Sequence, residues 1–251
     1  MIEWLFFLAL VFIVLVIFYK QANEEFTILQ CDGTQLTNLA NLFTEKYPIV
    51  VKQIQIPSFF SPEAIQQNPR IQTFPMKQPG KTLLDALSDS TLTIPDESTA
   101  LLAQHIGLQV WSEHNWLPYI TSWSYLFSIE TSAHCGERTL RKTTAYTTIV
   151  MPTSQPIEIA ILTGSQEKYF PTTWRTRFPE TFTMLDTPLV GNIKFIIIKV
   201  KPGTALCIPP HWLYSVRGTD PKKSLLWATM EVHHPLSKMG AKLERMNSIE
   251  N

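Results

Sequence analysis

The chain has 251 residues, of which 45% are hydrophobic, so it is long and apolar enough to bury a sizeable core. Lysine plus arginine and aspartate plus glutamate number 21 each, and this balance excludes the general attraction to nucleic acid that a basic protein has. The three cysteines, Cys31, Cys135 and Cys207, lack C-x-x-C spacing, which argues against a disulfide framework and a structural zinc site and fits a reducing compartment.

Residues 1–20 are predicted to form a single-pass membrane anchor, with the lipid bilayer as partner. The run from Trp4 to Tyr19 is apolar without interruption, and its two ends carry the aromatic residues that are typical of membrane interfaces. A cleavable signal peptide is the alternative, but no Lys or Arg precedes the run and no small-x-small cleavage site follows it. Lys20 follows the run, so the positive-inside rule predicts that the remaining chain faces the cytosol.

Residues 21–35 are expected to be a polar spacer, and residues 36–123 to be the helical and irregular N-terminal part of the main domain. Apolar residues at helical spacing over 36–43 predict a helix, followed by a β-branched strand. Residues 57–80 are rich in Pro, Gln and Ser and show no period, which predicts an irregular surface segment. A short helix is expected over 98–107.

Residues 124–232 are predicted to form the β core of the chain, because they contain a succession of short apolar segments with turn residues between them. Ile157, Ile159 and Ile161 alternate with other residues, as in a strand that buries one face. This number of strands indicates a sandwich or barrel. The expected fold is therefore mainly β with flanking helices, in the α+β class.

Residues 233–251 are expected to be a C-terminal tail that is solvated or docked on its own domain, although its apolar and basic residues also allow a membrane-surface helix. His233 and His234 are neighbours, and neighbours in a strand point to opposite faces. We therefore do not expect the two to bind one ion together.

The segment "KPGTALCIPPHWLYSV", residues 201–216, reads as a turn, a strand, a second turn and another strand. Pro then Gly suits a type II turn, because Pro fixes φ and Gly accepts a positive φ. Two further prolines cannot donate to a ladder and must end the first strand. The positions that define this segment are Pro202, Gly203, Pro209, Pro210 and Trp212.

This order resembles the "P-G-D-x-L-x-I-P-x-x-W-W-H-x-V" signature of cupin-like proteins in the JmjC-related branch of the double-stranded β-helix superfamily. In that family an upstream H-x-D/E follows an apolar strand, and "YLFSIETSAHCGERTL" occupies the similar place here, with His134 at the first histidine. The segment "EKYPIVVKQI" resembles the strand that leads into such domains. The resemblance covers about residues 36–232 and implies a jelly-roll fold.

Active members of that family are oxygenases that use Fe(II) and 2-oxoglutarate, with two histidines and one carboxylate on the iron. The resemblance places Gly136 at the carboxylate and Tyr214 at the second histidine. Glycine brings no ligand, and a phenol is mostly neutral at pH 7. Residues 153–156 offer no basic side chain for the distal carboxylate of 2-oxoglutarate. We therefore expect a catalytically inactive protein with no cofactor, in which Tyr214 fills the volume of the metal near His134.

The alternative is an Fe(II) and 2-oxoglutarate dependent oxygenase with a rearranged metal site, built from His134, Glu137 and His211. A bulge would be needed to turn Glu137 inward. The favoured role is structural or in binding another protein. The chain also resembles membrane-anchored cupin-like proteins of nucleocytoplasmic large DNA viruses, which implies the internal membrane of a virion as its location.

Overall fold

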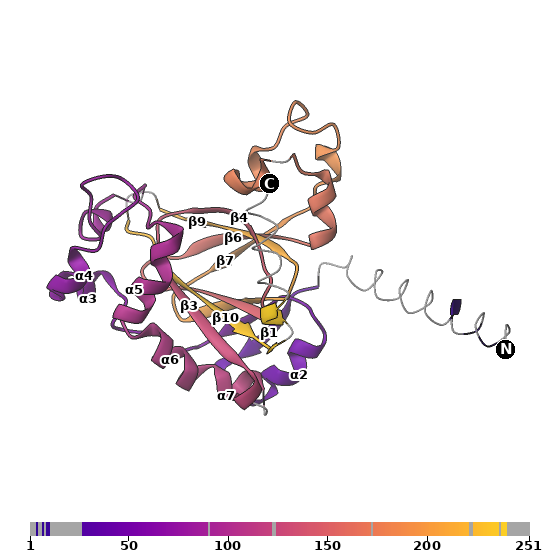
Figure 1. Cartoon of the computed structure of the whole chain (residues 1–251), viewed down its shortest axis with the longest axis horizontal. Coiled ribbons are helices and arrows are strands. Elements are labelled where there is room, and N and C mark those ends of the chain that lie inside the picture. Colours follow the sequence, from indigo (N-terminus) through magenta and orange to yellow (C-terminus); the bar gives the residue numbers. More distant parts are fainter. Residues whose placement is uncertain are drawn as a thin grey trace.

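The structure is a computed structural model that describes residues 4, 7, 9, 10, 27–89, 91–121, 124–171, 173–220, 223–235 and 237–239 (Figure 1). It shows a mixed α+β fold with two sheets of mostly antiparallel strands, which confirms the predicted class at this level. No helix in the described residues is long and apolar enough to cross a bilayer. Trp4 is described and exposed, whereas Tyr19, Lys20 and residues 240–251 lie outside the described part, so the anchor stays a prediction.

In the described part of the chain, eight strands from residue 128 onward are divided equally between the two sheets. The larger sheet has the order β1-β2-β8-β5-β10-β3, and the smaller one has the order β4-β9-β6-β7. All neighbouring strands are antiparallel except β1 and β2. The strands are β1 Leu29–Asp32, β2 Ile49–Lys52, β3 Ser128–Cys135, β4 Arg138–Lys142, β5 Thr147–Pro152, β6 Ile157–Leu162, β7 Ile196–Val200, β8 Thr204–Ile208, β9 Leu213–Gly218 and β10 Leu226–His233.

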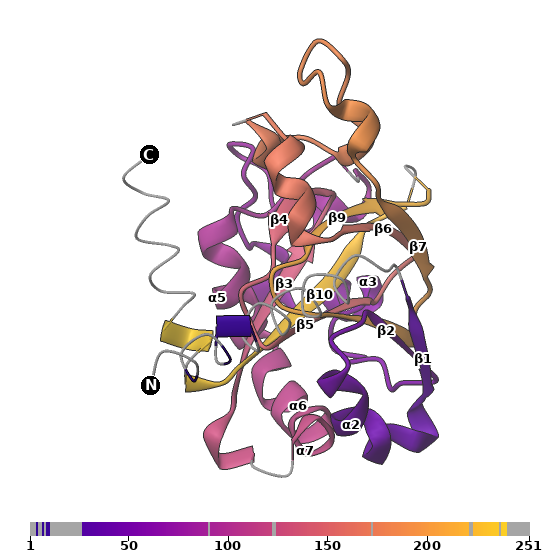
Figure 2. The same cartoon turned by 90° about the vertical axis from the view of Figure 1, so that its right-hand side faces the viewer.

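Short helices cover one face of the larger sheet, and the smaller sheet covers the other face (Figure 2). The α-helices are α2 Leu39–Thr44, α3 Pro62–Gln67, α4 Pro69–Gln72, α5 Thr99–His105, α6 Leu108–Asn115 and α7 Leu117–Ile120. The 3-10 helices are η1 Gly33–Asn38, η2 Asp85–Leu87, η3 Asp96–Ser98, η4 Ser124–Leu126, η5 Gly164–Tyr169, η6 Trp174–Thr176, η7 Pro179–Thr181 and η8 Val190–Asn192.

Two segments differ from the sequence prediction. Residues 29–32, expected in the spacer, form β1, because Leu29 and its neighbours pair with β2. Residues 57–80, expected to be irregular, contain α3 and α4. Each begins with a proline after a capping side chain: Ser61 accepts from the N–H of Ala64, and Asn68 accepts from the N–H of Arg70.

Successive side chains in the strands of the larger sheet point alternately into two different cores. In β10, Met230 and Val232 join the core beneath the helices, whereas Trp227 joins the core between the sheets. Strand side chains point to opposite faces in turn, so Thr229, Glu231 and His233 follow Trp227 toward the smaller sheet. Polar groups therefore line part of the space between the sheets.

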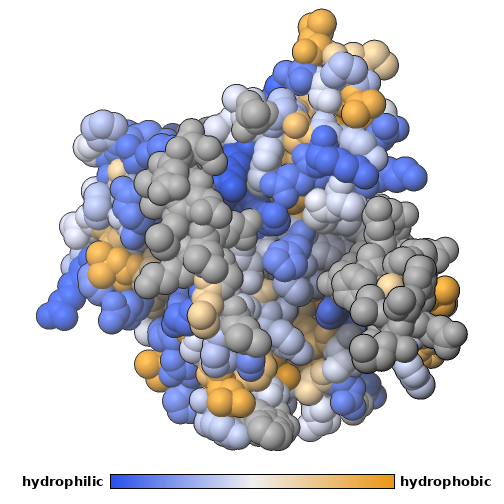
Figure 3. Space-filling model, turned by 45° about the vertical axis from the view of Figure 1, so that its right-hand side comes forward, coloured by the Kyte–Doolittle hydropathy of each residue, from blue (hydrophilic) through white to orange (hydrophobic). Residues whose placement is uncertain are grey.

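Residues 164–195 form an insert on the outer face of the smaller sheet. Their aromatic side chains Trp174 and Phe182 pack with Leu140, Leu162 and Leu213 in a third, small core. Hydrophobic surface is visible at the top of Figure 3. Met184 and Leu185, which belong to the insert, are exposed.

Candidate functional site

The structure places His134 and Tyr214 on different sheets. His134 is at the end of β3, in the larger sheet, and Tyr214 is near the start of β9, in the smaller one. Both side chains are buried. The strand beside β9 is β4, and its Arg141 lies directly opposite Tyr214. A guanidinium group therefore stands next to the tyrosine in the ladder.

Gly136 has no room for a ligating side chain. It lies in the turn between β3 and β4 with φ of 81°, in the left-handed region that glycine accepts readily. A Cβ atom at this position would be 2.5 Å from the carbonyl oxygen of Leu92. The loop before η3 therefore packs against the glycine, and a carboxylate at position 136 would require the backbone to move.

The turns of the signature segment form where they were predicted. Gly203 has φ of 84°, and the N–H of Thr204 donates to the carbonyl of Lys201 at 2.9 Å. β8 ends at Ile208, before the two prolines. Trp212 is buried in the core between the sheets.

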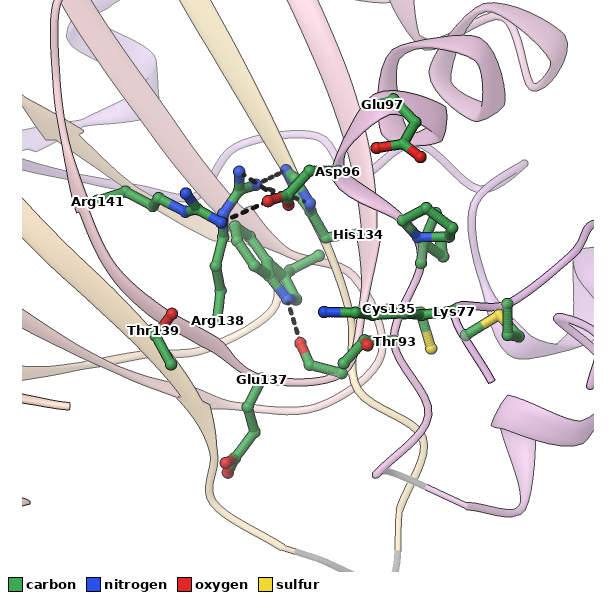
Figure 4. A pocket seen from close by; sticks show the side chains of 15 residues that line it. Lys77, Thr93, Asp96, Glu97, His134, Cys135, Glu137, Arg138, Thr139 and Arg141 are labelled. Atoms are coloured by element: carbon green, nitrogen blue, oxygen red, sulfur yellow. Dashed lines mark hydrogen bonds and ion pairs between the residues drawn. The ribbon is translucent and has the colours of Figure 1, made fainter. Parts of the chain in front are cut away.

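His134, Glu137 and His211 do not come together as a metal site. His211 is exposed on the second turn, where its backbone N–H donates to the carbonyl of Thr143 at 2.8 Å. Figure 4 shows Glu137 pointing away from His134. Within the described residues, the group of His, Cys, Asp or Glu side chains with metal-ligand spacing is Glu130, Glu231 and His233.

A cavity of about 530 Å³ opens beside the end of β3 and the start of β4. We call it the arginine pocket and define it by His134, Arg138, Arg141, Asp96 and Trp227, which all line it. Figure 4 labels the first four of these residues. Asp96 comes from η3, at the start of the helical layer, and reaches across to both arginines.

His134 is a neutral imidazole held on three sides. Its ring stacks on Trp227, with centroids 4.1 Å apart and planes at 21°. Nε2 is 3.0 Å from Oγ1 of Thr229, and Nη1 of Arg138 is 3.0 Å from Nδ1 and 3.1 Å from Nε2. Arginine can only donate, so we assign Nδ1 as its acceptor and place the ring proton on Nε2, which donates to Thr229. Burial, and then the charges of Arg138 and Arg141, hold the pKa of His134 well below its usual value.

The two arginines share a single carboxylate. Nη2 of Arg138 lies 3.3 Å from Oδ1 of Asp96, and Nη2 of Arg141 contacts the other oxygen, Oδ2. With His134 neutral, Arg138, Arg141 and Asp96 carry one net positive charge. Lys77, Glu97 and Glu137 also line the cavity, so its whole lining is formally neutral and the positive charge is local to the two arginines. The Nε atoms of both arginines are buried and have no hydrogen-bond partner. An anion in the cavity would have to contact the Nη atoms of the two guanidinium groups, whose planar forks match a carboxylate.

Tyr214 is a second neutral group near these charges. Burial raises its pKa to about 12, although the positive charge of Arg138 acts in the opposite direction. The charges of Arg138 act on His134 and Tyr214 alike. The positive charge of Arg138 therefore lowers the pKa of both side chains, and Arg138 contacts His134 directly.

The arginines were not identified from the sequence, because a regular strand points residues three apart to opposite faces. The pairing of β4 with β9 shifts its register between Arg138 and Arg141. Such an irregularity lets both side chains reach Asp96. The run "ERTLRK" contains both arginines, so the sequence showed two basic residues close together. That their side chains point to the same side depends on the register shift, which the sequence does not show.

No family model matches the sequence, and no curated protein matches it.

Proposed function

We propose that the chain is a catalytically inactive cupin-like protein, held on a membrane by residues 1–20, whose arginine pocket binds a carboxylate group of another protein. The strand order supports the cupin-like assignment. Strands β3 to β10 form two four-stranded sets, β8-β5-β10-β3 and β4-β9-β6-β7, and eight strands shared between two sheets are typical of the jelly roll.

The observation that carries the proposal is the pairing of Arg141 with Tyr214 across β4 and β9. In the family resemblance Tyr214 occupies the place of an iron-binding histidine. Arg141 beside it cannot replace that ligand, because a guanidinium has no lone pair to offer and its charge repels a cation. The same charge attracts an anion, and the planar fork of arginine matches a carboxylate.

The location follows from the apolar N-terminal run and from the resemblance to membrane-anchored viral proteins, which makes the internal membrane of a virion the proposed site. The full chain should stay in the membrane pellet after a carbonate wash, because sixteen consecutive apolar residues hold it there. Recovery of a soluble chain that begins after Tyr19 would instead identify a signal peptide.

The experiment compares glutarate with 2-oxoglutarate by calorimetric titration of the purified chain, with and without Mn(II). An oxygenase needs the 2-oxo group to chelate its metal, so it would prefer 2-oxoglutarate when metal is present. The proposed pocket reads only the carboxylates, and both ligands should bind equally. Two charge-assisted hydrogen bonds of roughly 2 kcal/mol each correspond to a Kd on the order of 1 mM.

Arg138→Met and Arg141→Met should each weaken this binding about thirtyfold, which corresponds to the loss of roughly 2 kcal/mol. Arg70→Met is the matched control, since Arg70 is an exposed arginine on α4 outside the pocket. Failure of both acids to bind at roughly ten times the expected Kd would contradict the proposal. Release of succinate from 2-oxoglutarate with Fe(II) would replace it with the oxygenase alternative.

A further inference from the structure

A second charged group lies on the same face of β3 and β10 as the arginine pocket. Glu130 of β3 and Glu231 of β10 are direct partners in the antiparallel ladder. His233 is two residues beyond Glu231 and so points to the same face. We call Glu130, Glu231 and His233 the carboxylate cluster.

The spacing of the cluster is that of ligands around an ion rather than of hydrogen-bonded groups. Nε2 of His233 is 3.5 Å from Oε2 of Glu231 and 3.9 Å from Oε2 of Glu130. Both distances exceed the ordinary hydrogen-bond range. Ligand atoms about 2.1 Å from a tetrahedral ion lie about 3.4 Å from one another, so small side-chain movements would complete such a site.

The imidazole of His233 is buried and lacks a hydrogen-bond partner. The side chain of His233 is 2% exposed, and neither of its ring nitrogens has a hydrogen-bond partner. A buried polar group without a partner is costly. The neighbouring His234 does not share this position, because its ring packs against Phe127 at a centroid distance of 5.2 Å.

The charges also leave room for a cation. Two carboxylates directly opposite one another in a sheet repel. Lys238 lies 3.0 Å from Oε1 of Glu130, on the oxygen that does not face His233. Lys238 therefore contacts Glu130 from the side away from His233 and leaves Oε2 directed toward the cluster.

We infer that Glu130, Glu231 and His233 bind one divalent transition-metal ion, with Zn(II) or Mn(II) as the class of ligand. One imidazole nitrogen and two carboxylate oxygens suit such ions, whereas Mg(II) prefers oxygen ligands alone. The carboxylate side chains are 44% and 32% exposed, so an ion can reach them from solution. This site contains none of the residues of the arginine pocket and does not depend on the function proposed for that pocket.

The test is calorimetric titration of the full chain, without an affinity tag, with Zn(II) and with Mn(II). We expect one ion per chain for at least one metal. Glu130→Gln and Glu231→Gln keep the side-chain shape and should each weaken binding by about tenfold or more. Glu158→Gln is the control, because Glu158 pairs with Lys199 at the surface of β6.

A Co(II)-loaded sample supplies a second measurement, since its visible absorption should change in Glu231→Gln and stay unchanged in Glu158→Gln. Absence of binding for both metals would show that the cluster is not a metal site. Binding that neither cluster variant alters would place the ion elsewhere. Either of these results overturns the inference.

Discussion

The arginine pocket and the carboxylate cluster lie on one face of the same two strands, yet their charges are opposite. They are separated by about 13 Å along β10, from Trp227 to Glu231, with Thr229 between them. The arginine pocket is anchored by a buried aromatic stack and by Asp96 from another element. No ring stacks on His233 among the residues that the structure describes. One face of a strand pair can thus carry two sites of opposite charge. The site whose side chains pack on a buried aromatic ring is the one expected to contribute to stability.

The largest expected effect is at Trp227, which is fully buried, stacks on His134 and donates from Nε1 to the carbonyl of Gly136 at 2.9 Å. Trp227→Ala should lower the free energy of unfolding by about 3–5 kcal/mol, measured by urea denaturation. Trp227→Phe keeps the ring packing and should cost much less. A loss below about 1 kcal/mol in Trp227→Ala would contradict the difference drawn between the two sites, because the stack would then contribute little to stability.

Gly136 offers the next largest effect and has a matched control. Gly136→Ala combines a positive φ with a Cβ that would clash with the Leu92 carbonyl, so we expect a loss of roughly 2–4 kcal/mol. Gly80 also has a positive φ, of 74°, but a Cβ there would meet nothing within 4 Å. Gly80→Ala should cost only about 1 kcal/mol. Equal losses in the two variants would show that backbone strain alone matters at position 136.

Acid should weaken the arginine pocket through His134. The unfolded chain binds the proton near the usual histidine pKa of 6.5, whereas the folded chain resists it because the folded pKa is well below that value. Stability contributed by the neutral ring is therefore complete above pH 6.5 and is lost as the pH falls below it, by at most about 1.4 kcal/mol per pH unit. Denaturation at several pH values should show this slope in the natural chain and a smaller slope in His134→Gln. His211→Gln, on an exposed turn, serves as the control, and an unchanged slope in His134→Gln would disprove the assignment.

The smallest effect is expected at Lys238, whose side chain is 57% exposed. Lys238→Met removes an exposed ion pair with Glu130 and should change the free energy of unfolding by about 0–1 kcal/mol. It should also tighten Zn(II) binding, because a competing positive charge leaves the carboxylate cluster. Weaker Zn(II) binding in this variant would show instead that Lys238 holds Glu130 in position. The carboxylate cluster would then, like the arginine pocket, depend on a residue from another element.

The sequence predicted the parts of the fold that depend on neighbouring residues. Alternation at Ile157, Ile159 and Ile161 indicated a strand, and Pro202 with Gly203 indicated a turn, since both patterns act over a few residues. The arginine pocket depends on distant partners: Arg141 meets Tyr214 through the pairing of β4 with β9, and Asp96 arrives from η3. These contacts follow from strand order and from a shift of register, which no local pattern encodes.

The carboxylate cluster shows the same limit. The adjacent His233 and His234 drew attention as a pair, but the partners of His233 are Glu231 and Glu130, and Glu130 belongs to the first strand of the β core. Its position opposite Glu231 is fixed by the β3 and β10 register. A pair about one hundred residues apart in the sequence gives no spacing to recognise.

The position of β10 has a consequence for synthesis of the chain. β10 comes last, yet it lies inside the larger sheet, between β5 and β3. Until residues 226–233 have left the ribosome, the facing sides of β3 and β5 have no neighbour and present open backbone groups to other chains. The larger sheet can close only after residue 233 has been translated, so nascent chains should depend on chaperones and a stop codon shortly before residue 226 should yield aggregates.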